Sequence, residues 1–363
     1  MIMETHEVQV PGQRTWTLFQ LENDQGMSVH FLNFGGIITN ISVPDRNGNS
    51  KNVVLSYEDF EDYVKNPGFL GALIGRVAGR IKNSCFQIEG REYEVEANEG
   101  EHHLHGGKRG FHQRLWKASP FERDREIGVK LSHKSLEGEG GYPGTIHVEV
   151  TYTLTNDNQL IIDYLAETDR KTVLTLTNHS YFNLSGKADH TVHNHSLFLN
   201  SSRFAKLDNQ LIPTGEWIDV TDTPFDFRQN RKLRSSFSYE TAQQRAANGG
   251  IDHFFLLDGE GKPAIRLEDG ESGRTLEVET DQPGIVIYTS NNLQEGRNLS
   301  EGKTMTHSGI CIETQSSPAS LHETGFPDIV LTPDKPYHRR TIFKFGTGAY
   351  TWRENNINLI SPS

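Results

Sequence analysis

The sequence predicts an all-β protein, a large antiparallel β-sandwich formed as a single domain by residues 1–363. Three observations predict this fold: short segments alternate apolar and polar residues, turn-forming residues separate these segments, and helical periodicity is scarce. Residues 146–154 alternate most clearly, because every even position is apolar or aromatic and every odd position is polar. Further strands are expected at residues 160–165, 173–177, 276–280, 285–289, 310–315 and 341–345.

The segments between these strands contain residues that favour tight turns. Asn156–Asp157–Asn158 is one example, and 34 glycines and 14 prolines are distributed along the chain. Helical turns are expected only at residues 56–63 and 239–247, which are too short to form a helical layer. No repeat or linker divides the chain, and no strand leads into Gly-x-Gly-x-x-Gly, so a dinucleotide-binding fold is disfavoured.

The composition excludes several classes of function. The 363 residues include 36 Lys and Arg against 48 Asp and Glu, and the net charge of −12 argues against a nucleic-acid partner. No apolar run approaches the ~20 residues that span a bilayer, and the first residues lack the features of a signal peptide. A cytoplasmic protein without membrane contact is therefore expected. Cys85 and Cys311 are too few for a disulfide framework.

His179 is the first candidate catalytic residue, in the segment that follows the strand expected at 173–177. Strand alternation would place His179 on one face with Thr175 and Thr177, and a face of this kind can bind a polar ligand. The alternative is a histidine whose hydrogen bonds are satisfied locally at the end of a strand.

Glu313 is the second candidate. In the strand expected at 310–315 it shares a face with Cys311 and Gln315, while Ile310 and Ile312 occupy the other face. A carboxylate with so few charged neighbours is expected to be partly desolvated, which would raise its pKa and suit a general base near neutral pH. The alternative is a glutamate paired with an arginine at the surface of a sheet.

Two groups of histidines raise the question of a metal site. His102, His103 and His105 lie within four residues, and His103 and His105 would share a strand face. Imidazole is a common metal ligand, but no nearby carboxylate or cysteine completes a recognisable spacing, so no metal is expected. His193 and His195 could also pair on a strand, and a structural role is favoured for them.

Arg76, Arg80 and Asp252 are polar groups in apolar or turn-rich segments. Either arginine could neutralise a carboxylate, and Asp252 could cap a turn. Each of these signals is weak when taken singly.

Taken in order, several uncommon segments resemble the aldose 1-epimerase (galactose mutarotase) family. They are Asn-Phe-Gly-Gly at 33–36, Gly-Arg-Val-Ala-Gly-Arg-Ile at 75–81, Leu-His-Gly-Gly at 104–107, Gly-Tyr-Pro-Gly at 141–144, Thr-Asn-His-Ser-Tyr-Phe-Asn-Leu at 177–184, Ile-Asp-His at 251–253 and Gly-Ile-Cys-Ile-Glu-Thr-Gln at 309–315. They span about residues 30 to 345. The resemblance implies the family's large β-sandwich and an isomerase that interconverts the α and β anomers of an aldose.

The resemblance also implies roles for individual residues. It places the general base, which takes the proton of the C1 hydroxyl, on Glu313, and the general acid, which protonates the ring oxygen, on His179. The two groups are expected to act through the sugar from opposite sides, and no cofactor is required. The family's sugar-contacting positions fall on Arg80, His105, Ser180, Tyr181 and Asp252.

Two departures from the family pattern affect the choice of sugar. Gly79 stands where the family commonly has Asn, and Val286 stands where it has Gln. The expected substrate is a free aldohexose such as galactose or glucose, bound by a monomer or a homodimer. The alternatives are a hexose-6-phosphate mutarotase, a non-catalytic sugar-binding module, and a glycoside hydrolase, which would usually need two carboxylates.

Overall fold

The computed structural model describes residues 1–259 and 263–348, and it confirms the all-β prediction. The described part contains one α-helix, α1 (Ala242–Ala246), in the stretch where a helical turn was expected. The turn expected at 56–63 is a 3₁₀ helix at Phe60–Val64. Other 3₁₀ helices are Lys82–Ser84, Phe111–Gln113, Glu139–Gly141, Val192–Asn194, Leu233–Ser236 and Pro318–Leu321.

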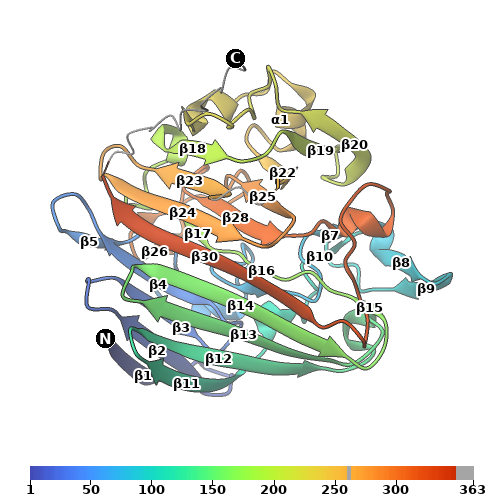
Figure 1. Ribbon diagram of the computed structural model, residues 1–363, viewed down its shortest axis with the longest axis horizontal. Helices are drawn as coiled ribbons and strands as arrows, with labels where there is room; N and C mark the ends of the chain where they lie inside the picture. The colour runs from blue at the N-terminus through green and yellow to red at the C-terminus, as the bar shows by residue number, and fades with distance from the viewer. Residues whose placement is uncertain (260–262, 349–363) are drawn as a thin grey trace, which may run out of the picture.

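The largest sheet forms one layer of the molecule, rising in Figure 1 from β11 at the bottom to β18 at the top. Its nine described strands are antiparallel, in the order β11 (Lys117–Arg123), β12 (Glu126–Ser135), β13 (Ile146–Thr155), β14 (Gln159–Thr168), β30 (Tyr337–Thr347), β24 (Arg274–Thr280), β23 (Ile265–Glu268), β18 (Ser196–Leu199) and β21 (Arg231–Lys232). The strand predicted at 146–154 is β13, and its even-numbered side chains are buried as the alternation requires.

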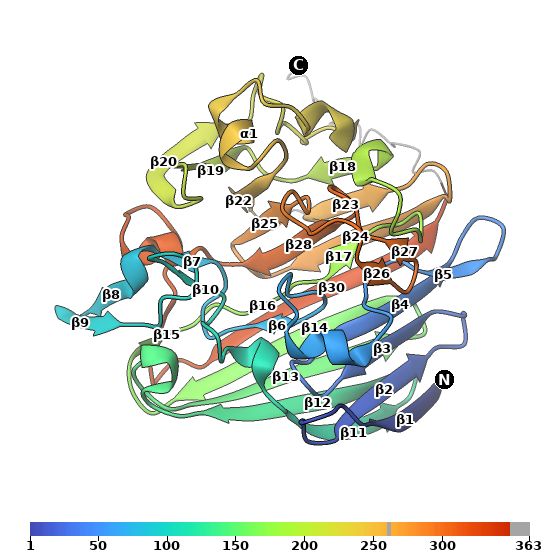
Figure 2. The ribbon, with the colours of Figure 1, turned by 180° about the vertical axis from the view of Figure 1, so that it is seen from behind.

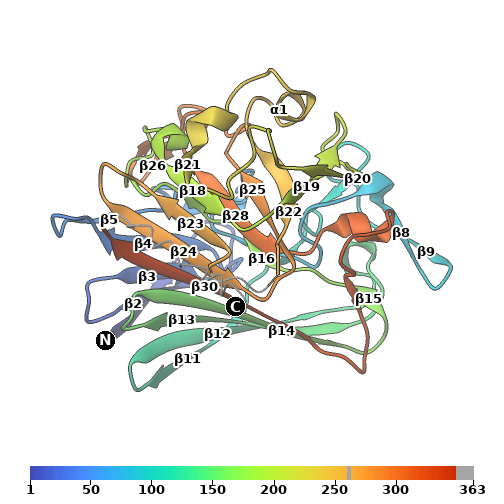
Figure 3. The same ribbon diagram turned by 45° about the horizontal axis from the view of Figure 1, so that its top comes forward.

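Two further sheets pack against this layer. The five-stranded sheet contains β1 (Ile2–Val8), β2 (Trp16–Glu22), β3 (Ser28–Leu32), β4 (Ile38–Pro44) and β5 (Ser50–Asn52). The six-stranded sheet has the order β17 (Tyr181–Phe182), β28 (Ile310–Gln315), β25 (Gly284–Tyr288), β22 (Asp252–Leu256), β19 (Arg203–Leu207) and β20 (Pro213–Asp219). Figure 3 shows β28, β25 and β22 of the six-stranded sheet close to β24 and β30 of the large one.

One large apolar core joins the three sheets. Phe31 of β3 packs edge-on against Tyr152 of β13 with ring centroids 4.9 Å apart, and Phe182 of β17 packs against Phe343 of β30 at 5.5 Å. Ile310 of β28 points into the same core. Because successive strand residues face opposite sides, the alternate residues of β28 are directed away from this core.

Five pairs of short strands occupy the remaining described segments. They are β6 (Leu73–Ile74) with β16 (Thr177–Asn178), β7 (Arg80–Ile81) with β10 (His103–Leu104), β8 (Cys85–Ile88) with β9 (Arg91–Glu94), β15 (Thr172–Val173) with β29 (Val330–Leu331), and β26 (Asn298–Leu299) with β27 (Gly302–Lys303). Seen from behind, β6, β7, β10 and β16 lie at mid-height, between the five-stranded and six-stranded sheets (Figure 2). Among the described residues no helix has the length and apolar character needed to cross a bilayer.

The structure corrects two local predictions. Residues 173–177 do not form one strand, since β15 and β16 pair with different partners at the two ends of this segment. His193 and His195 do not pair on a strand either. His193 lies in the 3₁₀ helix and contacts His307, whereas the buried His195 ring accepts a hydrogen bond from the backbone N–H of Leu184. The structural role favoured for His195 agrees with this contact.

Arg76 has a structural role rather than a place in a carboxylate pair. Its guanidinium is buried and donates hydrogen bonds to the backbone carbonyls of Ser135, Leu136, Pro143 and Gly144 and to the Ser135 hydroxyl. Burial lowers its pKa to about 10, which leaves it charged at neutral pH. The side chain therefore ties the end of β12 to the segment that precedes β13 through five hydrogen bonds.

Arg76→Met is expected to lower the free energy of unfolding by about 3–5 kcal/mol, because buried carbonyl groups lose their donors. Urea denaturation of the variant and the wild type would measure this change. Arg123→Met is the matched control, since Arg123 forms an exposed pair with Glu126 and should change stability by less than about 1 kcal/mol. Equal stability of the two variants would contradict the structural role of Arg76.

Candidate active site

A cavity of about 340 Å³ opens on the face of the six-stranded sheet that is turned away from the core. Strands β22, β25 and β28 supply its floor, and segments from the short strand pairs close its sides. This arrangement brings together most of the site residues predicted from the sequence, which line the cavity as Arg80, His105, His179, Tyr181, Asp252 and Glu313. Concave, largely buried sites with a few converging polar groups are typical of small-ligand binding.

Glu313 lies on β28 and faces the cavity, as the alternation of this strand predicts. Its cross-strand neighbour is Val286 of β25, and only 3% of Glu313 is exposed. Burial raises the pKa of Glu313 well above its ordinary value, and the nearby charge of Asp252 adds to the effect while Arg80 opposes it. The desolvated carboxyl expected from the sequence is therefore present.

His179 follows β16 and is held by the backbone on both sides. Its N–H donates to the carbonyl of Ala72, and its carbonyl accepts from the N–H of Gly71. The ring is buried, with Nδ1 3.5 Å from the Sγ of Cys311. Burial lowers the pKa of His179 to about 4, so the imidazole is neutral at physiological pH.

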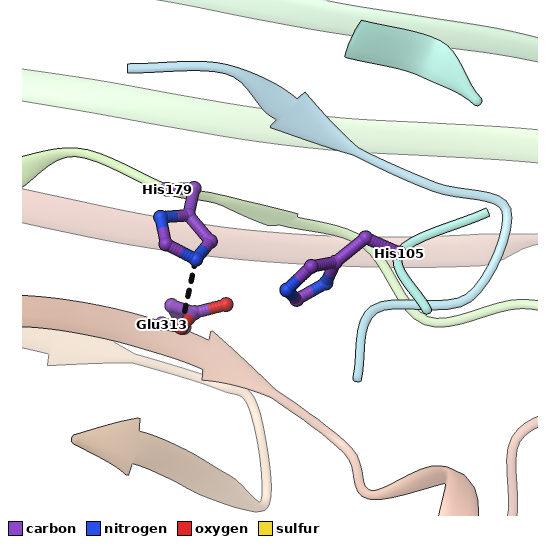
Figure 4. A group of neighbouring side chains, drawn as sticks. All are labelled: His105, His179 and Glu313. Atoms are coloured by element: carbon purple, nitrogen blue, oxygen red, sulfur yellow. Dashed lines mark ion pairs between the residues drawn. The ribbon is translucent and has the colours of Figure 1, made fainter. Parts of the chain in front are cut away.

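The candidate acid and base lie side by side rather than on opposite sides of a bound sugar. His179 Nε2 is 3.6 Å from Glu313 Oε1, and Figure 4 shows the two groups pointing toward each other. This corrects the expected placement. The arrangement can still serve a hemiacetal, because the C1 hydroxyl oxygen and the ring oxygen are bonded to the same carbon and both can be reached from one side.

His105 presents a hydrogen-bond donor to the same point. Its Nδ1 accepts from the backbone N–H of Gly79 at 3.1 Å, so in the neutral imidazole the hydrogen lies on Nε2. Figure 4 shows a ring nitrogen of His105 directed toward Glu313. Burial holds the pKa of His105 well below its ordinary value, which keeps the ring in this neutral, donating form.

His105, His179 and Glu313 could also be considered as metal ligands, since one ligand atom of each lies within 4.8 Å of the others. The hydrogen bond from Gly79 disfavours this use, because Nε2 of His105 then carries a hydrogen and offers no lone pair. His103 does not join this group. Its ring contacts the Tyr142 hydroxyl and the carbonyl of Glu96, so the two histidines do not share a functional face.

Arg80 and Asp252 form the charged side of the cavity. Arg80 makes a two-pronged ion pair with Glu99, with Nε–Oε2 at 2.5 Å and a second nitrogen–oxygen distance of 2.8 Å. Burial raises the pKa of Asp252 to about 6, although Arg80 opposes the shift. Glu99, which lines the cavity and orients Arg80, was not among the residues predicted from the sequence. Glu99 lies only six residues before His105, but its pairing with Arg80 depends on tertiary contacts that the sequence does not show.

Two residues of the segment after β16 have different positions. Tyr181 lines the cavity, and its hydroxyl donates to the carbonyl of Gly68. Ser180 is buried, its hydroxyl donates to Asn178 Oδ1, and it is not among the residues that line the cavity. Phe69, which sequence reasoning missed, packs its ring against His105 and His179, with centroid distances of 4.9 and 5.9 Å.

Comparison with known proteins identifies the family. The family model described as aldose 1-epimerase matches residues 17–344. The chain belongs to the aldose 1-epimerase family. A galactose mutarotase from Bos taurus is 38% identical over 337 residues, which cover 92% of this chain and 95% of the relative. An aldose 1-epimerase from Haemophilus influenzae is 33% identical over 348 residues, covering 95% of this chain and 100% of that protein.

Solved structures of other aldose 1-epimerases have the same fold. The galactose 1-epimerase of Lactobacillus acidophilus superimposes with a TM-score of 0.85 at 28% identity, over 96% of this chain and 99% of that one. An aldose epimerase homologue from C. elegans gives a TM-score of 0.83 at 30% identity, over 91% and 98% of the two chains. The large β-sandwich and the isomerase class implied by the resemblance are thus confirmed.

Buried histidines make the stability of this aldose 1-epimerase depend on pH. Burial lowers the pKa of His112, His179 and His195 to about 4 and that of His253 to about 3. In the unfolded chain these groups take up protons near pH 6.5, so below that pH the unfolded state binds more protons than the folded state. Stability from these groups is present above pH 6.5 and is lost as the pH falls toward 4.

We expect the melting temperature to fall by several degrees between pH 7.5 and pH 5.0, as measured by scanning calorimetry. Asp252 and Glu313 act in the opposite direction, because their raised pKa values make the folded state bind more protons as the pH falls. The four histidines outnumber these two carboxyl groups, so the net effect of acid is expected to be destabilising. A melting temperature that is unchanged or higher at pH 5.0 would contradict the expectation.

Proposed function

We propose that this enzyme interconverts the α and β anomers of a neutral aldohexose such as galactose or glucose, with Glu313 and His179 as the proton-transferring pair. The observation that carries the proposal is the adjacency of a buried carboxyl and a buried imidazole, 3.6 Å apart, in the cavity of a chain from the aldose 1-epimerase family. At 3.6 Å the two side chains are not hydrogen-bonded to each other, so both remain available to a sugar.

The proposed reaction balances with one proton shared by the pair. Glu313 takes the proton of the C1 hydroxyl while His179 donates a proton to the ring oxygen, so the C1–O5 bond breaks and an aldehyde forms. Rotation about C1–C2 exposes the other face of the carbonyl. His179 then takes back the proton of the C5 hydroxyl and Glu313 returns its proton to the carbonyl oxygen as the ring closes.

Burial favours the uncharged forms of both groups, so the shared proton rests on Glu313 while His179 is neutral. Transfer of this single proton to His179 gives the arrangement that opens the ring, and the opposite charges 3.6 Å apart attract each other strongly in a low-dielectric cavity. His105 donates to a sugar oxygen, and Arg80 and Asp252 serve other hydroxyls.

Polarimetry of freshly dissolved α-D-galactose and α-D-glucose, with and without the protein, tests the proposed function. We expect the approach to anomeric equilibrium to be accelerated for at least one of the two sugars. No acceleration with either sugar would contradict the proposal. The protein should release no sugar from a nitrophenyl glycoside, because the site pairs one carboxyl with an imidazole instead of using two carboxyls.

A hexose 6-phosphate is the second candidate substrate. It would require cationic groups that the cavity could direct at the phosphate. Among the described lining residues, Arg80 is paired with Glu99, and Arg297 donates from its Nε to Gln294. The pairing of Arg80 favours the neutral sugar, and comparing initial rates on glucose and glucose 6-phosphate separates the two substrates.

A further inference from the structure

Gln315 is a buried polar residue of the cavity to which the proposed reaction assigns no task. It lies on β28 two residues after Glu313, so both side chains are on the cavity face of this strand. Only 1% of Gln315 is exposed. Its position places a polar group about 7 Å along the strand from the proposed base, within the span of one pyranose ring.

The hydrogen bonds of Gln315 leave one atom unpaired. Its Nε2 donates to the carbonyls of Ala78 and Ser316, at 3.3 and 3.1 Å, which occupies both amide hydrogens. Its Oε1 is buried and accepts no hydrogen bond from any residue in the described part of the chain. A buried acceptor without a donor costs about 1–3 kcal/mol, so a ligand hydroxyl that donates to it is favoured.

Small and apolar residues face Glu313 and Gln315 from the neighbouring strand. Val286 is cross-strand from Glu313, and Gly284 is cross-strand from Gln315. On the other side Gly79 has a positive φ of 86°, and a Cβ there would lie 3.1 Å from Pro318 Cγ and 3.6 Å from Gln315 Nε2. The missing side chain at Gly79 therefore keeps this corner of the cavity open beside the Gln315 amide.

We propose that Gln315 is a substrate-recognition residue whose Oε1 accepts a hydrogen bond from one hydroxyl of the bound aldose, in the corner formed by Gly79, Val286 and Pro318. This inference rests on the proposed mutarotase function. It defines the substrate class as an aldopyranose that carries a free hydroxyl at this corner.

The test measures kcat and KM for anomerisation of D-galactose and its 2-, 3-, 4- and 6-deoxy analogues by the wild type and Gln315→Met. We expect kcat/KM on galactose to fall about 3- to 10-fold in the variant, mainly through KM, as for the loss of one neutral hydrogen bond. With the wild type, kcat/KM for one deoxy analogue should be lower than for galactose by a similar factor. With the variant, that analogue and galactose should have the same kcat/KM. If galactose is not turned over, the glucose series is used.

A purely structural role would give a different pattern. If Gln315 only anchors Ala78 and Ser316, the variant should lose the same factor on every sugar, and this outcome overturns the inference. Gln282→Met is the matched control, because Gln282 is also a buried glutamine whose Nε2 donates and whose Oε1 has no partner in the described residues, but it lies outside this cavity. In Gln282→Met, the loss of any one sugar hydroxyl should change kcat/KM by the same factor as in the wild type.

Two further results keep the inference separate from the proposed function and from folding. A wild type inactive on every sugar contradicts the proposed function, whereas an active wild type without coupling contradicts only the role of Gln315. If Gln315→Met does not fold, a crystal structure of the wild type with bound galactose replaces it. A hydroxyl within hydrogen-bond distance of Oε1 would support the inference, and its absence there would overturn it.

Discussion

Glu313→Gln is expected to lower kcat for anomerisation by about 10²–10⁴-fold while KM stays close to the wild-type value. Glutamine has the shape of glutamate and can still hydrogen-bond the C1 hydroxyl, but it cannot accept the proton. The loss should therefore appear in the chemical step. Because burial already favours the uncharged form of this carboxyl, the neutral amide should leave the stability close to that of the wild type.

The measurement is polarimetry over a range of sugar concentrations, after subtraction of the spontaneous rate. Glu277→Gln is the matched control, since Glu277 forms an ion pair with Arg266 on β23 and β24 of the large sheet and does not border the cavity. It should retain wild-type kcat. A kcat of Glu313→Gln within about threefold of wild type would show that another group removes the proton.

His179→Asn is expected to cause a loss of similar size, about 10²–10⁴-fold in kcat. Asparagine can occupy the buried position and form hydrogen bonds, but it cannot carry a proton to the ring oxygen. His147→Asn is the control, because His147 is exposed on β13 and lies far outside the cavity. If His179→Asn kept wild-type kcat while Glu313→Gln lost it, the acid would have to be another residue.

The double variant distinguishes a cooperating pair from two independent contacts. If one proton moves between the two groups through the sugar, removing either group disables the exchange, and removing both costs little more than removing one. We therefore expect the double variant to be within about tenfold of the weaker single variant. Multiplied losses would indicate that His179 and Glu313 contribute separately, for example by binding different hydroxyls.

The regular strands could be predicted because their periodicity is local. The segment 310–315 was expected as a strand with Glu313 on one face and Ile312 on the other, and β28 has these bounds and faces. Residues 146–154 were predicted for the same reason, because the alternation of apolar and polar residues directly gives the buried and exposed positions of the strand.

The irregular segments could not be predicted in this way. Residues 173–184 were expected to begin as one strand, but short pairings with β6, β28 and β29 divide them, and each pairing depends on a distant part of the chain. Strand alternation therefore gave no guide to Ser180, whose hydroxyl turns back to Asn178. His103 was misplaced beside His105 because the hydroxyl of Tyr142 holds its ring elsewhere.

The sequence by itself determined the fold class, the family and the chemical types at the site, because alternation and short motifs are properties of neighbouring residues. Only the tertiary structure decided that His179 and Glu313, far apart along the chain, lie 3.6 Å apart on the same side of the cavity. It also decided the pairing of Arg80 with Glu99, the hydrogen on His105 Nε2 and the unpaired oxygen of Gln315. These features depend on burial and on contacts between distant segments, which pack together only when the three sheets assemble.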